Sequence, residues 1–75
     1  MKPDDVLREN IQFLRSRTGL TVRQFAAAVG MKESTFKLRC SRPGTLRWSE
    51  IQTMRRLGMD YGIDITGRRL GNAER

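Results

Sequence analysis

The chain has no histidine, and its one cysteine among 75 residues is Cys40. Histidine is the commonest metal ligand and general base in proteins, and a single thiol cannot close an internal disulfide. The sequence also lacks paired carboxylates at catalytic spacing and a glycine-rich phosphate loop. We therefore expect a protein that is not an enzyme and that has no metal, no cofactor and no small-molecule substrate.

Long apolar runs are missing as well. The longest lies within residues 25–29, far short of the roughly 18 residues that a membrane-spanning helix needs. The first residues, MKPDDV, contain no hydrophobic signal region. These absences predict a small, soluble, intracellular domain with no membrane partner.

Positive charge is abundant but unevenly placed. The net charge is +7, yet residues 1–14 and 48–75 together carry equal numbers of basic and acidic side chains. The whole excess lies in residues 15–47, where Glu33 is the only acid. Such a concentration is typical of a protein that binds a polyanion. A solvated basic face that serves solubility is the alternative.

The first half of the chain predicts two helices. Leu7, Ile11 and Leu14 recur at helical spacing, which predicts a helix from about residue 4 to residue 18. Thr21 is a good N-cap with glutamine three residues later, as in a capping box, so a second helix should cover residues 22–29. Gly30 then ends it in a left-handed conformation that glycine adopts freely.

Two further helices follow. Phe36 and Cys40 lie one turn apart, which predicts a third helix over residues 32–40, ended by a Pro-Gly turn. Renewed helical periodicity from Trp48 predicts a fourth helix that Gly58 caps. We expect the Trp48 ring to pack in the core or as a staple at the helix N-terminus, with stacking on a sugar as the alternative.

The remaining residues change pattern. Apolar residues alternate with polar residues or glycine over 59–66, which favours a short strand, with a fifth helix as the competing interpretation. Tyr61, Ile63 and Ile65 could pair with a second copy as an antiparallel strand, or pack back on their own bundle. Residues 67–75 are expected to form a flexible basic tail.

The segment from Thr21 to Arg39 has the spacing of a helix-turn-helix. Two helices that cross steeply need a small residue at their first contact, which Ala26 supplies, and Gly30 follows it by four residues. We therefore expect an all-α fold, a compact bundle of four to five helices over residues 1–58.

On Ala26, Gly30 and Phe36, and on the following stretch STFKLRCSRPGTLRWSEIQTMRRLG, the chain resembles lambda-repressor-like (XRE-type) DNA-binding domains, especially small phage Cro-like proteins. The resemblance covers roughly residues 5–58. It implies a repressor-type regulator of transcription from a phage or other mobile element, acting on double-stranded DNA in the bacterial cytoplasm, at the nucleoid. Many relatives carry a glutamine clamp where this chain has Val22.

In that docking mode the second helix of the motif enters the major groove. Turning Phe36 and Cys40 inward points a set of side chains at base edges, namely Lys32, Glu33, Ser34, Lys37 and Leu38. Glu33 is interpreted either as a reader of cytosine or as the ion-pair partner of Lys37. The predicted phosphate contacts are Arg23, Thr35, Arg39, Arg42 and Arg47.

One short recognition helix covers few base pairs, so a homodimer is expected to read two half-sites. A protein-interaction module that reuses this fold, such as an antirepressor or an inhibitor of a nucleic-acid enzyme, is the alternative function.

Overall fold

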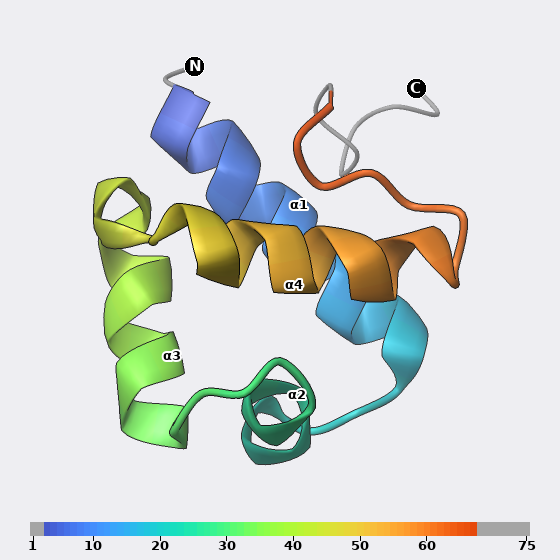
Figure 1. Ribbon diagram of the computed structural model, residues 1–75, viewed down its shortest axis with the longest axis horizontal. Helices are drawn as coiled ribbons and strands as arrows, with labels where there is room; N and C mark the ends of the chain where they lie inside the picture. Colours follow the sequence, from blue (N-terminus) through green and yellow to red (C-terminus); the bar gives the residue numbers. More distant parts are fainter. Residues whose placement is uncertain (1–2, 68–75) are drawn as a thin grey trace.

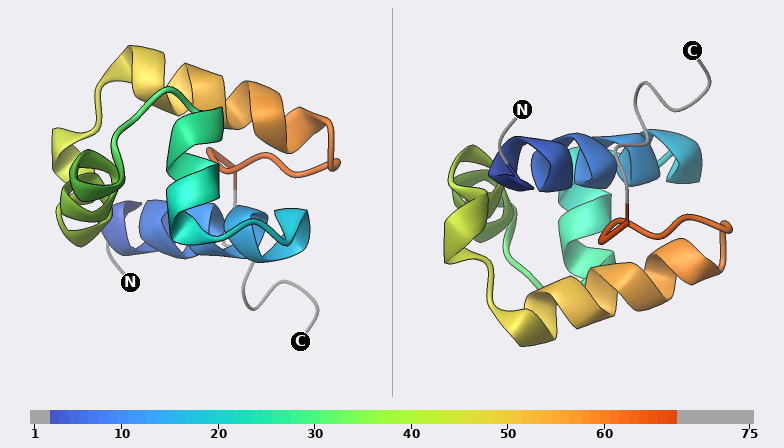
Figure 2. Two further views of the ribbon diagram at one scale, coloured as in Figure 1. Left: turned by 90° about the horizontal axis from the view of Figure 1, so that it is seen from below. Right: turned by 90° about the horizontal axis from the view of Figure 1, so that it is seen from above.

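The computed structural model describes residues 3–67, and the predicted all-α bundle is confirmed there. Its elements are α1 (Pro3–Thr18), α2 (Val22–Ala28), α3 (Glu33–Ser41), the 3-10 turn η1 (Pro43–Thr45) and α4 (Trp48–Met59). Figure 1 shows α4 lying across α1, with α3 at one end of this pair. Both views in Figure 2 show α2 bridging the space between α1 and α4. Within these residues no strand forms.

One apolar core joins all four helices. Its buried members are Ile11, Leu14, Phe25, Ala26, Val29, Phe36, Cys40, Met54, Ile63 and Ile65. The rings of Phe25 on α2 and Phe36 on α3 lie 5.4 Å apart between centroids, at a tilt of 57°. Aromatic pairs favour such tilted contacts over face-to-face stacking, so this pair fixes how α3 sits against α2.

The turn between α2 and α3 forms as its residues predict. Thr21 Oγ1 accepts a hydrogen bond from the Gln24 N–H at 3.1 Å, and Gln24 Oε1 accepts one from the Thr21 N–H at 3.0 Å, which completes the capping box. Gly30 has φ of +77°, the left-handed region that a side chain disfavours. The Met31 N–H then donates to the Ala26 carbonyl at 2.8 Å and closes the turn.

Residues 60–67 correct the sequence analysis, because they form turns and neither a strand nor a fifth helix. Ile63 and Ile65 are 6% and 1% exposed. The segment runs back between α1 and α4 (Figure 2). The period of two arises because the two isoleucines enter the core of their own bundle, so they are not available to a strand of a second copy. Residues 68–75 of the predicted tail lie outside the described residues.

The returning segment is tied to α1 by a buried polar side chain. Asn10 is fully buried, and its Nδ2 donates to the Ile65 carbonyl at 3.0 Å. A longer contact of 3.4 Å reaches the Gly67 carbonyl. Because an unpaired buried carbonyl costs free energy, Asn10 stabilises a segment that has no regular structure of its own.

Gly58 does not cap α4 as predicted but lies inside it, buried, one residue before its end. Its carbonyl accepts a hydrogen bond from the Ile63 N–H at 2.9 Å. A Cβ at this position would lie 2.5 Å from the Ile63 carbonyl oxygen. Glycine is therefore required by the close approach of the returning backbone.

Trp48 is the second correction within α4, because its side chain is 64% exposed and does not enter the core.

None of the helices between residues 3 and 67 combines the length and apolar character that crossing a bilayer requires.

We predict that Gly58→Ala destabilises the protein by about 1–3 kcal/mol, because the added methyl group must displace the backbone at Ile63. Helix propensity alone predicts the opposite sign, a gain of about 1 kcal/mol. Denaturant unfolding followed by circular dichroism measures the difference. Ser16→Ala, at an exposed site of α1, is the control and should raise stability by a few tenths of a kcal/mol. A more stable Gly58→Ala protein would contradict the close approach.

Candidate nucleic-acid interface

Helix α3 has one face in the core and one in solvent. Phe36 and Cys40 are 1% and 8% exposed and anchor the inner face. Ser34, Lys37 and Leu38 are exposed on the outer face. The division follows the helical spacing expected from the sequence, so the candidate reading residues of α3 share one accessible surface.

The start of α3 lacks a side-chain cap. Lys32 is the N-cap residue, in extended conformation and exposed, and its side chain makes no capping hydrogen bond. The helix begins at Glu33, one residue later than predicted. A carboxylate in the first turn complements the positive end of the helix dipole, which compensates in part for the missing cap.

Of the two interpretations of Glu33, the structure contains the ion pair. Lys37 Nζ lies 3.2 Å from Glu33 Oε2, and the two side chains are 63% and 41% exposed. Exposed pairs at this spacing stabilise a helix by only about 0.2–0.5 kcal/mol. Separating the two charges to meet another group therefore costs little.

Arg39 is placed differently from the other candidate phosphate contacts. Its Nε lies 3.3 Å from Glu50 Oε1 on α4, and the two side chains are only 19% and 17% exposed. The same carboxylate oxygen accepts a hydrogen bond from the Arg47 N–H at 2.8 Å. Nε is buried and makes no hydrogen bond to any residue that the structure describes, so its attraction to Glu50 is Coulombic. Phosphate contact by Arg39 would require breaking this pair.

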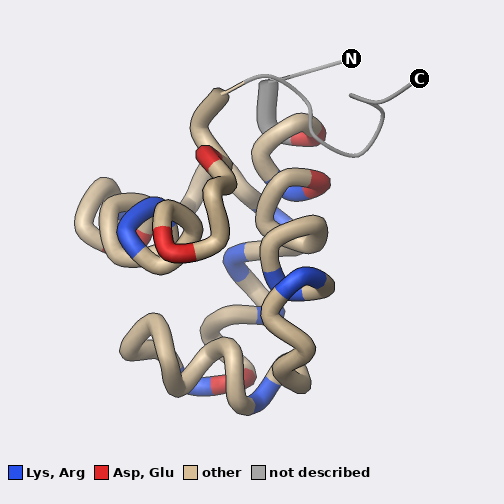
Figure 3. Tube along the Cα trace, turned by 90° about the vertical axis from the view of Figure 1, so that its right-hand side faces the viewer, with Lys and Arg blue, Asp and Glu red and all other residues tan. Residues whose placement is uncertain are grey.

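The remaining candidates are accessible to different degrees. Arg23, Arg42 and Arg47 are exposed and form no ion pair with the side chains described between residues 5 and 67, whereas Thr35 is half-buried. Arg42 and Arg47 lie on either side of η1, which packs against α1 and α3. Figure 3 shows basic positions on several elements rather than on one helix.

Cys40 contributes to packing rather than to chemistry. Burial raises the pKa of its thiol, while the charges of Arg8 and Arg15 lower it to a lesser extent. The neutral thiol is a poor nucleophile, and it packs as a small apolar group. Within the part of the chain that the structure describes, no three acidic or cysteine side chains gather where they could hold a metal ion.

Two residues that position this region were not identified from the sequence. Glu50 stands three residues after the N-cap of α4, the place where a capping box carries glutamate, but the cap itself is Arg47 and not serine or threonine. Asn10 lies between Leu7 and Leu14 on the apolar face of α1. A polar residue on a face that is otherwise apolar could have indicated a buried hydrogen bond.

Comparison with known proteins adds no relative: no model of a protein family, no curated protein and no solved structure matches this chain.

We predict that Glu50→Ala lowers the free energy of unfolding by about 1–3 kcal/mol, because it leaves Arg39 without its counter-charge and the Arg47 N–H without its acceptor. Glu50→Gln keeps a carbonyl oxygen for that N–H and should cost less. Glu33→Gln, which breaks an exposed pair, is the matched control and should change stability by less than about 0.5 kcal/mol. Equal effects at the two glutamates, measured by chemical denaturation, would refute the positioning role of Glu50.

Proposed function

We propose that this protein is a sequence-specific regulator that binds double-stranded DNA and reads the major groove with α3. The observation that carries the proposal is the two-sided character of α3. Phe36 and Cys40 hold one face in the core, and the other face presents polar and apolar side chains to solvent. In helix-turn-helix docking, the second helix meets base edges with its N-terminal half.

The exposed side chains have the chemistry that base recognition needs. Lys32 can donate to guanine N7 and O6, Ser34 can donate or accept, and Leu38, 54% exposed, can pack on a thymine methyl group. The pair Glu33–Lys37 is weak enough to open, after which the carboxylate can accept from cytosine N4. Each good contact discriminates between bases by about 1–3 kcal/mol.

Phosphate contacts are assigned to the accessible cations around α3. Arg23 precedes it on α2, and Arg42 and Arg47 follow it around η1. Thr35 is a neutral donor in this set, and Arg39 is left out because Glu50 holds it. Three neutralised phosphates give a slope of about −3 for log K against log salt concentration.

The resemblance to Cro-like proteins suggests what such binding would do. A small domain that occupies an operator blocks transcription by exclusion, and two copies on two half-sites supply the specificity that a single short helix lacks. The proposal is therefore a repressor-type regulator of a phage or other mobile element, acting in the bacterial cytoplasm as a homodimer.

We expect that selection of bound duplexes from a random pool, at about 150 mM salt, returns a palindromic consensus. Binding of equal strength to every duplex, with no enriched motif, would contradict sequence-specific reading. That result would favour the alternative function, a protein-interaction module whose basic surface meets an acidic partner.

Two variants distinguish recognition of bases from electrostatic attraction to phosphates. Lys37→Ala should relax the sequence preference, whereas Arg42→Ala should weaken binding to all duplexes by a similar factor and make the salt slope shallower by about 1. Titrations of consensus and scrambled duplexes at several salt concentrations measure both effects. If both variants weaken all duplexes equally, Lys37 does not read bases.

A further inference from the structure

Large apolar side chains are exposed on α3 and on α4 with the turn that follows it. Those most exposed in the described chain are Leu38, Trp48, Met59 and Tyr61, at 54%, 64%, 61% and 47%. Leu38 belongs to the candidate reading face of α3. The other three lie on α4 and in the turn that follows it, so this second surface is apolar without a role in the proposed DNA contact.

Trp48 and Met59 lie on the same face of α4, with two polar residues between them. Trp48, Gln52, Arg55 and Met59 follow one another at intervals of four, three and four residues, which places them on one face of a helix. Met54 and Gly58 on a different face are buried in the core. We call the first set the α4 stripe; it begins and ends with a large apolar side chain and is polar in the middle.

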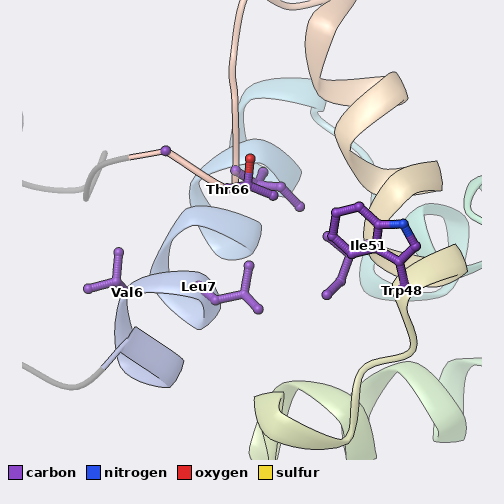
Figure 4. A pocket seen from close by; sticks show the side chains of 7 residues that line it. Val6, Leu7, Trp48, Ile51 and Thr66 are labelled. Atoms are coloured by element: carbon purple, nitrogen blue, oxygen red, sulfur yellow. The ribbon is translucent and has the colours of Figure 1, made fainter.

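The two ends of the α4 stripe have different shapes. Beside Trp48 lies an apolar groove of about 410 Å³ between α1 and α4. Figure 4 shows Val6 and Leu7 on its α1 side, Trp48 and Ile51 on its α4 side, and Thr66 along an edge. At the opposite end, Met59 and Tyr61 are exposed, and Met59 borders a smaller hollow of about 220 Å³. The larger hollow therefore lies at the Trp48 end, and an exposed flexible side chain lies at the other.

We propose that the α4 stripe binds a second copy of this chain, with the two α4 helices antiparallel about a two-fold axis. In the register that centres the axis on the middle of α4, Trp48 faces Met59 of the second copy, and Gln52 faces Arg55. A two-fold interface repeats each contact, so each copy's exposed Met59 side chain enters the other's groove beside Trp48. Sulfur–aromatic contact between methionine and tryptophan is favourable, and the Gln52 side-chain carbonyl can accept from a guanidinium.

Electrostatics favours this surface over the basic segment of residues 15–47. The chain carries a charge of +7, so most approaches of two copies are repulsive. Residues 47–64, however, contain three arginines and three carboxylates and are neutral as a unit. Antiparallel packing also brings Arg47, at the start of α4, near Asp60 at the end of the other α4.

The two Arg55 side chains near the axis are partly neutralised within each copy. Arg55 Nε lies 3.7 Å from Asp64 Oδ1. Hydrogen bonds from the Thr66 side chain and backbone, followed by the charge of Arg55, hold the pKa of Asp64 below its usual range. Asp64 therefore stays ionised at neutral pH and offsets the repulsion between the two arginines.

The proposed dimer rests on the proposed DNA-binding function, because it would place two recognition helices on one DNA duplex. Because α3 precedes α4 through η1, an antiparallel pair places the two α3 helices at opposite ends of the α4 pair. A 12-residue helix is about 18 Å long, so the two α3 helices lie at least about this far apart. Half-sites one DNA turn apart require a larger spacing of about 34–36 Å, to which the α3 helices contribute by lying beyond the two ends of the α4 pair.

Sedimentation equilibrium of the full chain without DNA tests the dimer. An interface of this size is small, so we expect a dissociation constant of about 10–100 μM. Met59→Glu, which places a charge against Trp48 of the second copy, should weaken the dimer at least about tenfold. Ser16→Glu adds the same charge near the end of α1 and should leave it unchanged. Circular dichroism should confirm that both variants keep the helical fold.

A chain that stays monomeric at about 200 μM, or a Met59→Glu protein that dimerises as the original does, overturns the proposal.

Cross-linking tests the antiparallel register. A mixture of Trp48→Cys and Met59→Cys chains should form a disulfide-linked pair under mild oxidation, whereas each variant alone should not, beyond the background set by buried Cys40 in the original chain. Cross-linking of each variant with itself would indicate a parallel pair and overturn this geometry. Both measurements omit DNA, so failure of the dimer is distinguished from failure of DNA binding.

Discussion

The fold depends on the insertion of Ile63 and Ile65 between α1 and α4. This segment has no regular structure, yet it fills the space that two helices of a 75-residue chain leave open. The position of this segment explains three features that are otherwise unrelated. Asn10 is buried because it holds the segment's backbone, Gly58 is glycine because that backbone passes close by, and α4 keeps an outer face that nothing in the described chain covers.

Local signals in the sequence sufficed for the α2–α3 unit. The capping box at Thr21, the left-handed Gly30 and the inward Phe36 each depend on residues within one turn of one another or on a fixed helical period, so pattern and structure agree. Residues 60–67 could not be predicted in this way. An alternating pattern indicates only that every second side chain is buried. Ile63 and Ile65 would be buried in the same way by a strand or by an irregular segment that lies across the bundle.

For the charged residues of the candidate site, too, local sequence patterns predict exposure but not contacts between helices. Helical spacing places Lys37 and Leu38 outside correctly, because the inner face of α3 is defined by its own apolar residues. It does not show that Arg39 meets Glu50, since that pair joins two helices and depends on how α4 crosses α3. The contact with Glu50 on another helix thus makes Arg39 less accessible than the other candidate cations. Glu50 positions Arg39, and its place three residues after the N-cap of α4 only partly suggests this role.

Under the proposed function and the proposed dimer, the charge distribution assigns DNA binding and self-association to different surfaces of the molecule. A protein that must bind a polyanion and also its own copy faces opposite electrostatic requirements, because the cations that attract phosphate repel a second chain. Here the exposed arginines Arg23, Arg42 and Arg47 lie around α3, while the segment from Arg47 to Asp64 is neutral. Arg47 belongs to both surfaces. If it contacts phosphate, it cannot also meet Asp60 of the second copy, so DNA binding and dimerisation compete for this one side chain and are coupled through it.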